Sequence, residues 1–175
     1  MIETAIIIGN AFSLCAMISD SVSGTRKSHR DMMAVQIVSQ FFYGASSIAL
    51  KGYSSTAQNA VAVFRNLAAM KNVKSKVLEW ALILAGVVLG IILNNRGLLG
   101  WLPILANLEY SVAVFKLREN GKALKLAFII NMVMYAVFSA VIQNYVGVVS
   151  CTVIAVTTLV SLIRGKEKTD KQQDA

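Results

Sequence analysis

A single arginine within a long apolar stretch is the residue of this chain whose chemistry is most informative. Arg65 belongs to the segment NAVAVFRNL, residues 59–67, and no other charged residue occurs between Gly52 and Met70. Ionisable side chains are costly in apolar helices, so they usually face a bundle interior, where they pair or line a solute path. Arg65 therefore predicts a buried ion pair, a site for an anionic solute group, or a side chain that extends to the membrane interface.

Glu109 is the candidate partner of Arg65. It lies in a later apolar segment, at a depth in its helix close to that of Arg65. Such a pair could tie two helices together without binding anything, because a buried ion pair need not be a functional site. Both residues are predicted members of a central site, and the sequence leaves open whether they are structural or bind the solute.

Carboxamide side chains supply the rest of the predicted site. Amides offer both donors and acceptors, so several that converge could hold a polar solute, although each could equally bridge two helices. The predicted substrate-binding set is Gln40, Asn59, Arg65, Asn107, Glu109 and Asn131. The chain has no nucleotide-binding loop, no nucleophile beside a base, no carboxylate pair and only one histidine. We therefore expect no enzymatic activity, no cofactor and no metal site.

Composition places these polar residues in a membrane protein. Of the 175 residues, 56% are hydrophobic and 15% charged, and the mean hydropathy is +0.62, which is unlike a soluble domain. A membrane-spanning helix needs about 20 mostly apolar residues. The predicted fold is therefore an all-α membrane protein with seven transmembrane helices, at 4–22, 32–50, 54–70, 77–93, 98–117, 124–142 and 145–163.

The basic residues predict how the bundle is oriented. Loops 23–31, 71–76 and 116–125 and the tail from residue 164 hold 14 of the 17 lysines and arginines, whereas Lys51 and Arg96 fall at the opposite ends of the helices. Basic residues of short loops stay in the cytoplasm. We expect a multi-pass protein of the bacterial inner membrane with its N-terminus outside and its C-terminus in the cytoplasm. The net charge of +8 is then a topology signal, and no nucleic-acid partner is predicted.

The chain also contains an internal duplication. A shift of 92 residues places Tyr43 on Tyr135 and Ser47 on Ser139, and it superimposes the ends of the first three predicted helices on those of the last three. One extra helix between two three-helix units makes the units parallel, related by an axis along the membrane normal. The predicted organisation is a first repeat at 1–76, a linker helix at 77–95, a second repeat at 96–164 and a disordered cytoplasmic tail at 165–175.

One stretch resembles a known family. The segment MAVQIVSQFFYGASSIALKGYSSTAQNAVAVFRNL, residues 33–67, contains a glutamine, an aromatic cluster, a Gly-Tyr turn and an Asn-to-Arg spacing, at Gln36, residues 41–43, Gly52 to Tyr53, and Asn59 to Arg65. It resembles the YgjV family of bacterial inner-membrane proteins, which is similar in plan to the SWEET and PnuC carriers. The resemblance covers roughly residues 9–67; it implies a fold of three, one and three helices and gives no substrate.

These features predict a transporter or facilitator for a small polar metabolite, with a central site between the two repeats. The alternative is a non-transporting sensor or accessory subunit built on the same bundle. A polar central cavity would favour the first, and an apolar core with Arg65 locked to Glu109 would favour the second. The expected partners are a small polar solute and the lipid bilayer. Gly86 and Gly90 could also allow a homodimer, although packing of the linker helix within its own bundle is favoured.

Overall fold

Seven α-helices and one short 3-10 helix make up the part of the chain that the structure, a computed structural model, describes: residues 2–23, 29–71, 73, 75–116 and 121–173. None of these residues lies in a strand. The helices are α1 (Ile2–Ser23), α2 (His29–Ala49), α3 (Tyr53–Met70), α4 (Lys76–Ile92), η1 (Gly97–Gly100), α5 (Trp101–Lys116), α6 (Gly121–Val141) and α7 (Tyr145–Gln173). The predicted all-helical class with seven helices is confirmed.

The C-terminal segment differs from the prediction. The sequence predicts a disordered tail from Gly165, but α7 continues as a helix to Gln173. Extending an existing helix adds one backbone hydrogen bond for each residue fixed, whereas starting a new helix is costly. No proline follows Gly165, so nothing in the tail forces the helix to stop where its apolar stretch ends.

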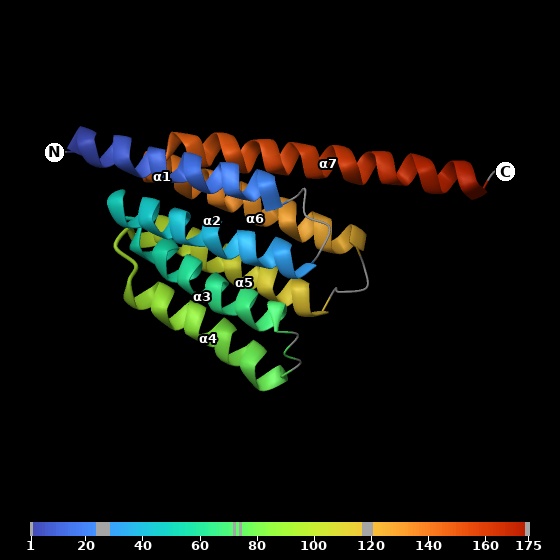
Figure 1. Cartoon of the computed structure of the whole chain (residues 1–175), viewed down its shortest axis with the longest axis horizontal. Coiled ribbons are helices and arrows are strands. Elements are labelled where there is room, and N and C mark those ends of the chain that lie inside the picture. Colours follow the sequence, from blue (N-terminus) through green and yellow to red (C-terminus); the bar gives the residue numbers. More distant parts are fainter. Residues whose placement is uncertain (1, 24–28, 72, 74, 117–120, 174–175) are drawn as a thin grey trace.

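Six helices form a ring, and α4 lies beside it. Along the chain, α1 packs on α2, α2 on α3, α5 on α6, and α6 on α7; contacts of α3 with α5 and of α1 with α7 close the ring, while α4 packs on α3 and α5. Figure 1 shows that α1, α3, α5 and α7 run in one direction, and α2, α4 and α6 in the other. Helices α1 to α3 therefore occupy one half of the ring, and α5 to α7 occupy the other half in the same order.

The turns that end α2 and α6 have the same backbone geometry. Lys51 and Gln143 have φ values of 56° and 60°, the left-handed region in which non-glycine residues are uncommon. The four backbone hydrogen bonds around each turn also join the same pairs of positions, shifted by 92 residues; for example, Gly52 N donates to Ser47 O at 2.7 Å, and Asn144 N to Ser139 O at 2.8 Å. This turn is a C-terminal helix cap that recurs in both halves of the chain.

Each of these turns is held by the other half of the chain. The Asn10 side chain, from α1, donates to Gln143 O at 3.0 Å and accepts from Val146 N at 3.0 Å. The carbonyl of Lys51 accepts from Asn95 Nδ2 at 2.8 Å and from Arg96 Nε at 3.3 Å. The two halves are thus hydrogen-bonded to each other at this end of the bundle.

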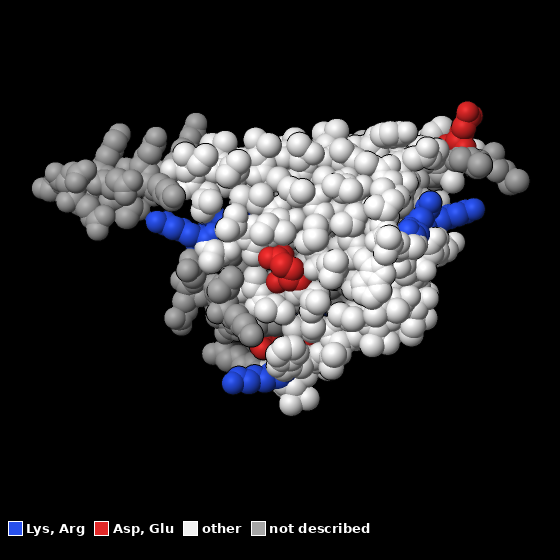
Figure 2. All heavy atoms as spheres, turned by 180° about the vertical axis from the view of Figure 1, so that it is seen from behind, with Lys and Arg blue, Asp and Glu red and all other residues white. Residues whose placement is uncertain are grey.

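The packing pattern is the reverse of that in a soluble protein. Among the described residues, the buried side chains are largely serine, asparagine, glutamine and alanine, whereas the exposed ones include large apolar residues on every helix. Figure 2 shows one face on which charged atoms gather near the ends of the bundle, with one acidic group near the middle. Soluble proteins rarely expose such continuous apolar surface.

Within the described part of the chain, no helix is both long enough and apolar enough to cross a membrane.

Helix α4 is fixed to the ring through its glycines. Ser75 caps its first turn by accepting a hydrogen bond from Leu78 N at 3.3 Å. Gly86 and Gly90 are buried, and a Cβ added at Gly90 would lie 2.6 Å from both Gln58 Nε2 and Ile104 Cγ1. The favoured packing of this helix within its own bundle is confirmed, because α3 and α5 of the same chain lie against both glycines, and a homodimer stays a prediction.

Candidate functional site

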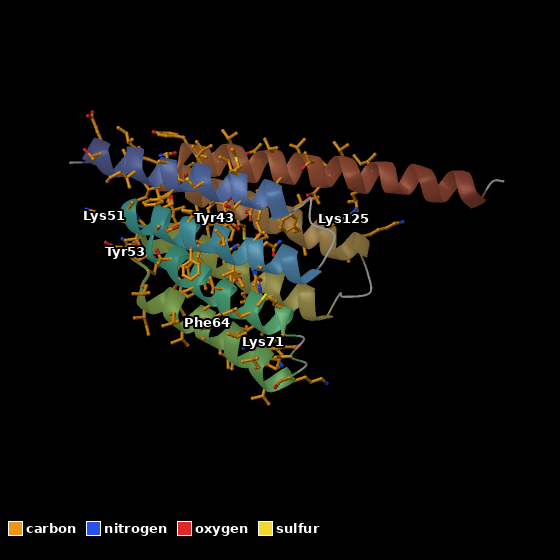
Figure 3. All side chains as sticks on the ribbon, viewed as in Figure 1. Tyr43, Lys51, Tyr53, Phe64, Lys71 and Lys125 are labelled. Carbon is orange, nitrogen blue, oxygen red and sulfur yellow. The ribbon has the colours of Figure 1, made fainter. Side chains whose placement is uncertain are left out.

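A cavity of about 360 Å³ lies within the ring and is lined by polar side chains from both halves. Five of the six predicted site residues line it: Gln40, Asn59, Arg65, Asn107 and Asn131. The lining also includes three tyrosines, which the sequence reasoning did not assign to the site: Tyr43, Tyr110 and Tyr135. Figure 3 places Tyr43 toward the middle of the bundle, far from both ends.

Arg65 reaches across from α3 to α5. Its Nη1 donates to Asn107 Oδ1 at 3.2 Å and to Ser111 Oγ at 3.3 Å, and its guanidinium carbon lies 5.8 Å from the centroid of the Tyr110 ring. The two hydrogen bonds and the cation–π contact fix the side chain within the bundle. An arginine that extended to the membrane interface would not make these contacts, so that alternative is wrong for Arg65.

Asn107 is the centre of a directed hydrogen-bond chain through three helices. Its Nδ2 donates to Gln58 Oε1 at 2.7 Å, and Gln58 Nε2 donates to the carbonyl of Gly86 at 2.8 Å. A guanidinium can only donate, and a carbonyl can only accept. The donors at Arg65 and the acceptor at Gly86 therefore determine the orientation of both amides between them, and the chain holds α3, α4 and α5 together.

Glu109 is not the partner of Arg65. Glu109 lies two residues from Asn107 and two from Ser111 along α5. Two residues correspond to a rotation of about 200° around an α-helix, so Glu109 points from a different face of α5 than these two residues. It does not line the cavity. Its Oε2 is buried and has no hydrogen-bond partner among the residues that the structure describes. The predicted Arg65–Glu109 pair is therefore wrong, since equal depth in two helices does not make two side chains face each other.

The remaining predicted amides have unequal surroundings. Asn131 Nδ2 donates to the carbonyl of Ala106 at 2.7 Å, so it bridges α6 and α5 while lining the cavity. Asn59 is buried, Gln40 is half-buried, and neither has a hydrogen-bond partner among the described residues. Their amide groups are therefore available to a molecule in the cavity.

Asp20 is the charged lining residue that the predicted site left out. Its carboxylate lines the cavity, accepts a hydrogen bond from Ser39 Oγ, and lies beside Tyr43. The spacing of small residues in the sequence of α1 could have indicated that Asp20 faces inward. Ser13 and Ala16 are buried on the same face of α1, and helical spacing continues that face to Asp20.

The cavity is lined by equivalent positions of the two halves. At the shift of 92 residues, seven pairs of lining residues correspond: Gln36 with Phe128, Gln40 with Met132, Tyr43 with Tyr135, Ser47 with Ser139, Ser55 with Gly147, Asn59 with Cys151, and Ala62 with Ile154. All of these residues lie on α2, α3, α6 and α7. These helices thus present the same faces to one central space.

The described residues include no group of three or more His, Cys, Asp or Glu side chains that could hold a metal ion. Of the two cysteines, Cys151 lines the cavity, whereas Cys15 is exposed on α1. What the arrangement offers chemically is a binding site: one cation, one carboxylate, several amides and three phenols around one cavity.

An all-helical bundle with an apolar exterior and a polar central cavity is typical of membrane proteins that bind or pass a solute. The family model Imp-YgjV, described as bacterial inner membrane protein, matches residues 7–169, and the chain belongs to this family. Comparison with curated proteins and with solved structures gives no match.

Proposed function

We propose that this protein is a carrier or facilitator for a small polar metabolite in the bacterial inner membrane, with its site in the cavity between two parallel three-helix repeats. The observation that carries the proposal is the cavity itself, because seven pairs of its lining residues are equivalent positions of the two halves. Carriers built from repeats bind their solute at the repeat interface, near the middle of the membrane.

The repeat organisation is supported by three features. The helices of the two halves follow the same order and direction around the ring. The turns after α2 and α6 share their left-handed residue and their hydrogen bonds. Each turn also accepts a hydrogen bond from the other half, from Asn10 or from Arg96, although these two donors are not equivalent positions. A rotation about an axis parallel to the helices would account for the first two features, whereas an inverted repeat would reverse the helix directions.

Membrane insertion and orientation are supported by the family and by the surface. The family is one of bacterial inner-membrane proteins, and the bundle exposes large apolar side chains between its ends. Lys51 lies at one end of the bundle, and Lys71 and Lys125 lie at the other (Figure 3). The end with Lys71 and Lys125 belongs to the loops that hold most of the basic residues, so we place it in the cytoplasm.

Orientation is tested with reporters fused after residue 175. A fluorescent protein that matures only in the cytoplasm should be bright at this position, and an alkaline phosphatase that is active only outside should be inactive. The matched fusion after Lys51 should give the opposite pattern. A silent fluorescent fusion at residue 175 together with an active phosphatase would overturn the proposed orientation.

The alternative function, a sensor or accessory subunit without transport, is less well supported. It was expected to have an apolar core with Arg65 locked to Glu109, and instead the interior holds a polar cavity into which several amides project. A sensor site needs access from one side of the membrane only, whereas a carrier or facilitator site must be accessible from both. Access to the cavity therefore separates the two functions.

Cysteine labelling measures this access. The variant Cys15→Ser leaves Cys151 as the single thiol, and it lines the cavity. We expect a membrane-impermeant thiol reagent to label Cys151 in right-side-out and in inside-out vesicles alike. A second variant without native cysteines but with Asn59→Cys, the equivalent position of the first half, should behave in the same way. Labelling of both thiols from one side only would overturn transport in favour of the sensor.

A further inference from the structure

The two halves of the cavity wall carry side chains of different polarity at equivalent positions. Where α2 and α3 present Gln36, Gln40 and Asn59, helices α6 and α7 present Phe128, Met132 and Cys151. Ala62 is likewise matched by the larger, apolar Ile154. Both halves supply a tyrosine, at Tyr43 and Tyr135. The second half also contributes Asn107, Asn131 and Asn144 to the lining, but at the equivalent positions of α2 with α6 and of α3 with α7 the first half presents amides where the second half presents apolar side chains or a thiol.

Both charges of the cavity come from the first half. Arg65 and Asp20 line it, while the equivalent positions of the second half are Thr157 and Val112. Neither charge has an ion-pair partner in the described part of the chain; Arg65 donates to Asn107 and Ser111, and Asp20 accepts from Ser39. The two opposite charges therefore line the same space and are not neutralised by each other.

The Arg65 guanidinium has hydrogen-bond donors that no described residue uses. Its hydrogen bonds within the described part of the chain use Nη1 only, which leaves the Nε and Nη2 groups of a side chain with five N–H donors. The residue is half-buried and lines the cavity, and neither Nε nor Nη2 is among the buried unpartnered atoms. These donors are accessible, and their fork matches the two oxygens of a carboxylate.

We propose that the cavity binds a small zwitterion with an apolar body, such as an apolar α-amino acid. Its carboxylate would be held by Arg65, its ammonium by Asp20 and the Tyr43 hydroxyl, and its apolar body would lie against Phe128, Met132 and Ile154. The proposal rests on the proposed function, since it names the solute class of the same site. A cavity of about 360 Å³ lies within the range of about 300 to 1,000 Å³ that is typical of small-molecule sites.

Each simpler solute leaves part of this site unmatched. A neutral polar molecule would leave both charges without a counter-charge, and an anion without an ammonium would leave Asp20 near a second negative charge. A zwitterion without an apolar body would leave the Phe128 and Met132 wall in contact with water. Buried charges are costly unless paired, so the zwitterion with an apolar body complements the most groups.

The test is isothermal titration calorimetry of the purified full-length protein in detergent, with four probes that differ by one group at a time. L-Leucine has all three features, 3-methylbutylamine lacks the carboxylate, 4-methylpentanoate lacks the ammonium, and glycine lacks the apolar body. We expect leucine to bind at least about tenfold more tightly than each of the others, as a charge-assisted hydrogen bond or a buried side chain implies. Equal or tighter binding of any of the three would overturn the proposal.

Variants assign each feature to a residue. Arg65→Gln should abolish the preference for leucine over 3-methylbutylamine, and Asp20→Asn the preference over 4-methylpentanoate. Met132→Gln introduces the residue that occupies the equivalent position of the first half, Gln40. It should weaken the binding of leucine and leave the affinity for glycine unchanged. Lys71→Gln, at an exposed position outside the cavity, is the matched control and should leave all four affinities unchanged. The wild-type probe series decides the proposal even if one variant fails to fold.

Uptake of radiolabelled leucine into proteoliposomes separates this proposal from the proposed function. Binding of leucine without uptake would contradict transport while supporting the solute class. Uptake of other solutes by the reconstituted protein, with no binding of leucine, would support transport and overturn the solute class. Tight binding of leucine together with leucine uptake that Arg65→Gln abolishes is the result expected if both are correct.

Discussion

Replacing Asn107 by leucine should destabilise the protein more than any other single change of a cavity amide. Among the described residues, the Asn107 side chain joins the Arg65 and Gln58 side chains through hydrogen bonds to both. Leucine has a similar volume but no polar atoms, so Asn107→Leu removes the hydrogen bond to the guanidinium and leaves Gln58 Oε1 without its donor. Gln58 is almost fully buried, with 1% of its surface exposed, so water cannot replace the lost partner.

The size of the effect follows from the two bonds. A hydrogen bond to a charged group contributes about 1.5–3 kcal/mol, and a buried unsatisfied polar atom costs about 1–3 kcal/mol. Interhelical hydrogen bonds in membranes average about 0.6 kcal/mol, and Arg65 retains Ser111 as an acceptor. We therefore expect a loss of about 2–4 kcal/mol in the free energy of unfolding, which lowers Tm by roughly 5–15 °C in a chain of this length.

The assay is thermal unfolding in detergent, followed by fluorescence-detected size exclusion. Gln40→Leu is the matched control, since Gln40 lines the cavity but has no hydrogen-bond partner among the described residues; its Tm should stay close to that of the wild type. The double variant of Asn107 and Gln58 should lose less than the sum of the single losses, because the residues are coupled. A Tm of Asn107→Leu equal to that of Gln40→Leu, or additive losses, would refute the hydrogen-bond chain.

Three further predictions use the same thermal assay. Gly90→Ala should lower the free energy of unfolding by about 1–3 kcal/mol, because a Cβ there overlaps two neighbouring side chains; an unchanged Tm would show that α4 is not packed as described. Lys51→Gly and Gln143→Gly should each raise the free energy of unfolding by about 1 kcal/mol, since the backbone of both residues is in the left-handed region, which glycine adopts without strain. Effects of opposite sign would contradict the equivalence of the two turns. Glu109→Gln should not rescue Arg65→Leu, because the two side chains are not paired; recovery in the double variant would restore the ion pair.

The number and approximate bounds of the helices were predictable because they depend on local sequence. Apolar runs between charged or turn-forming residues give the seven helices, and a helix makes all its backbone hydrogen bonds within its own segment. The 92-residue shift was also visible, since Tyr43 and Tyr135 or Ser47 and Ser139 coincide without gaps. The tail was not predictable from hydropathy, because helix propagation through Gln173 needs no apolar face.

The site was predictable in kind and only partly in membership. Arg65, Asn59 and Asn107 were found because polar groups in apolar helices turn inward, where they can be satisfied. Glu109 was wrongly included and Asp20 wrongly left out for one reason: depth along a helix follows from residue number, but the direction in which a side chain points depends on how the helix is rotated in the bundle. Glu109 lies on a different face from Asn107, whereas Asp20 shares the inward face of Ser13 and Ala16.

The sequence by itself determined that this chain forms seven helices, which ends carry the positive charge, and that polar groups lie inside, because each of these depends on hydropathy and charge along the chain. Only the tertiary structure decided which polar groups meet. The hydrogen-bond chain from Arg65 to Gly86 joins α3, α5 and α4, and the lining amides at Gln36, Gln40 and Asn59 face a cavity that Phe128, Met132 and Cys151 line at the equivalent positions of the other half. Such contacts depend on the rotation and spacing of whole helices, which are set by small-residue packing at positions such as Gly90 and are not encoded in any one segment.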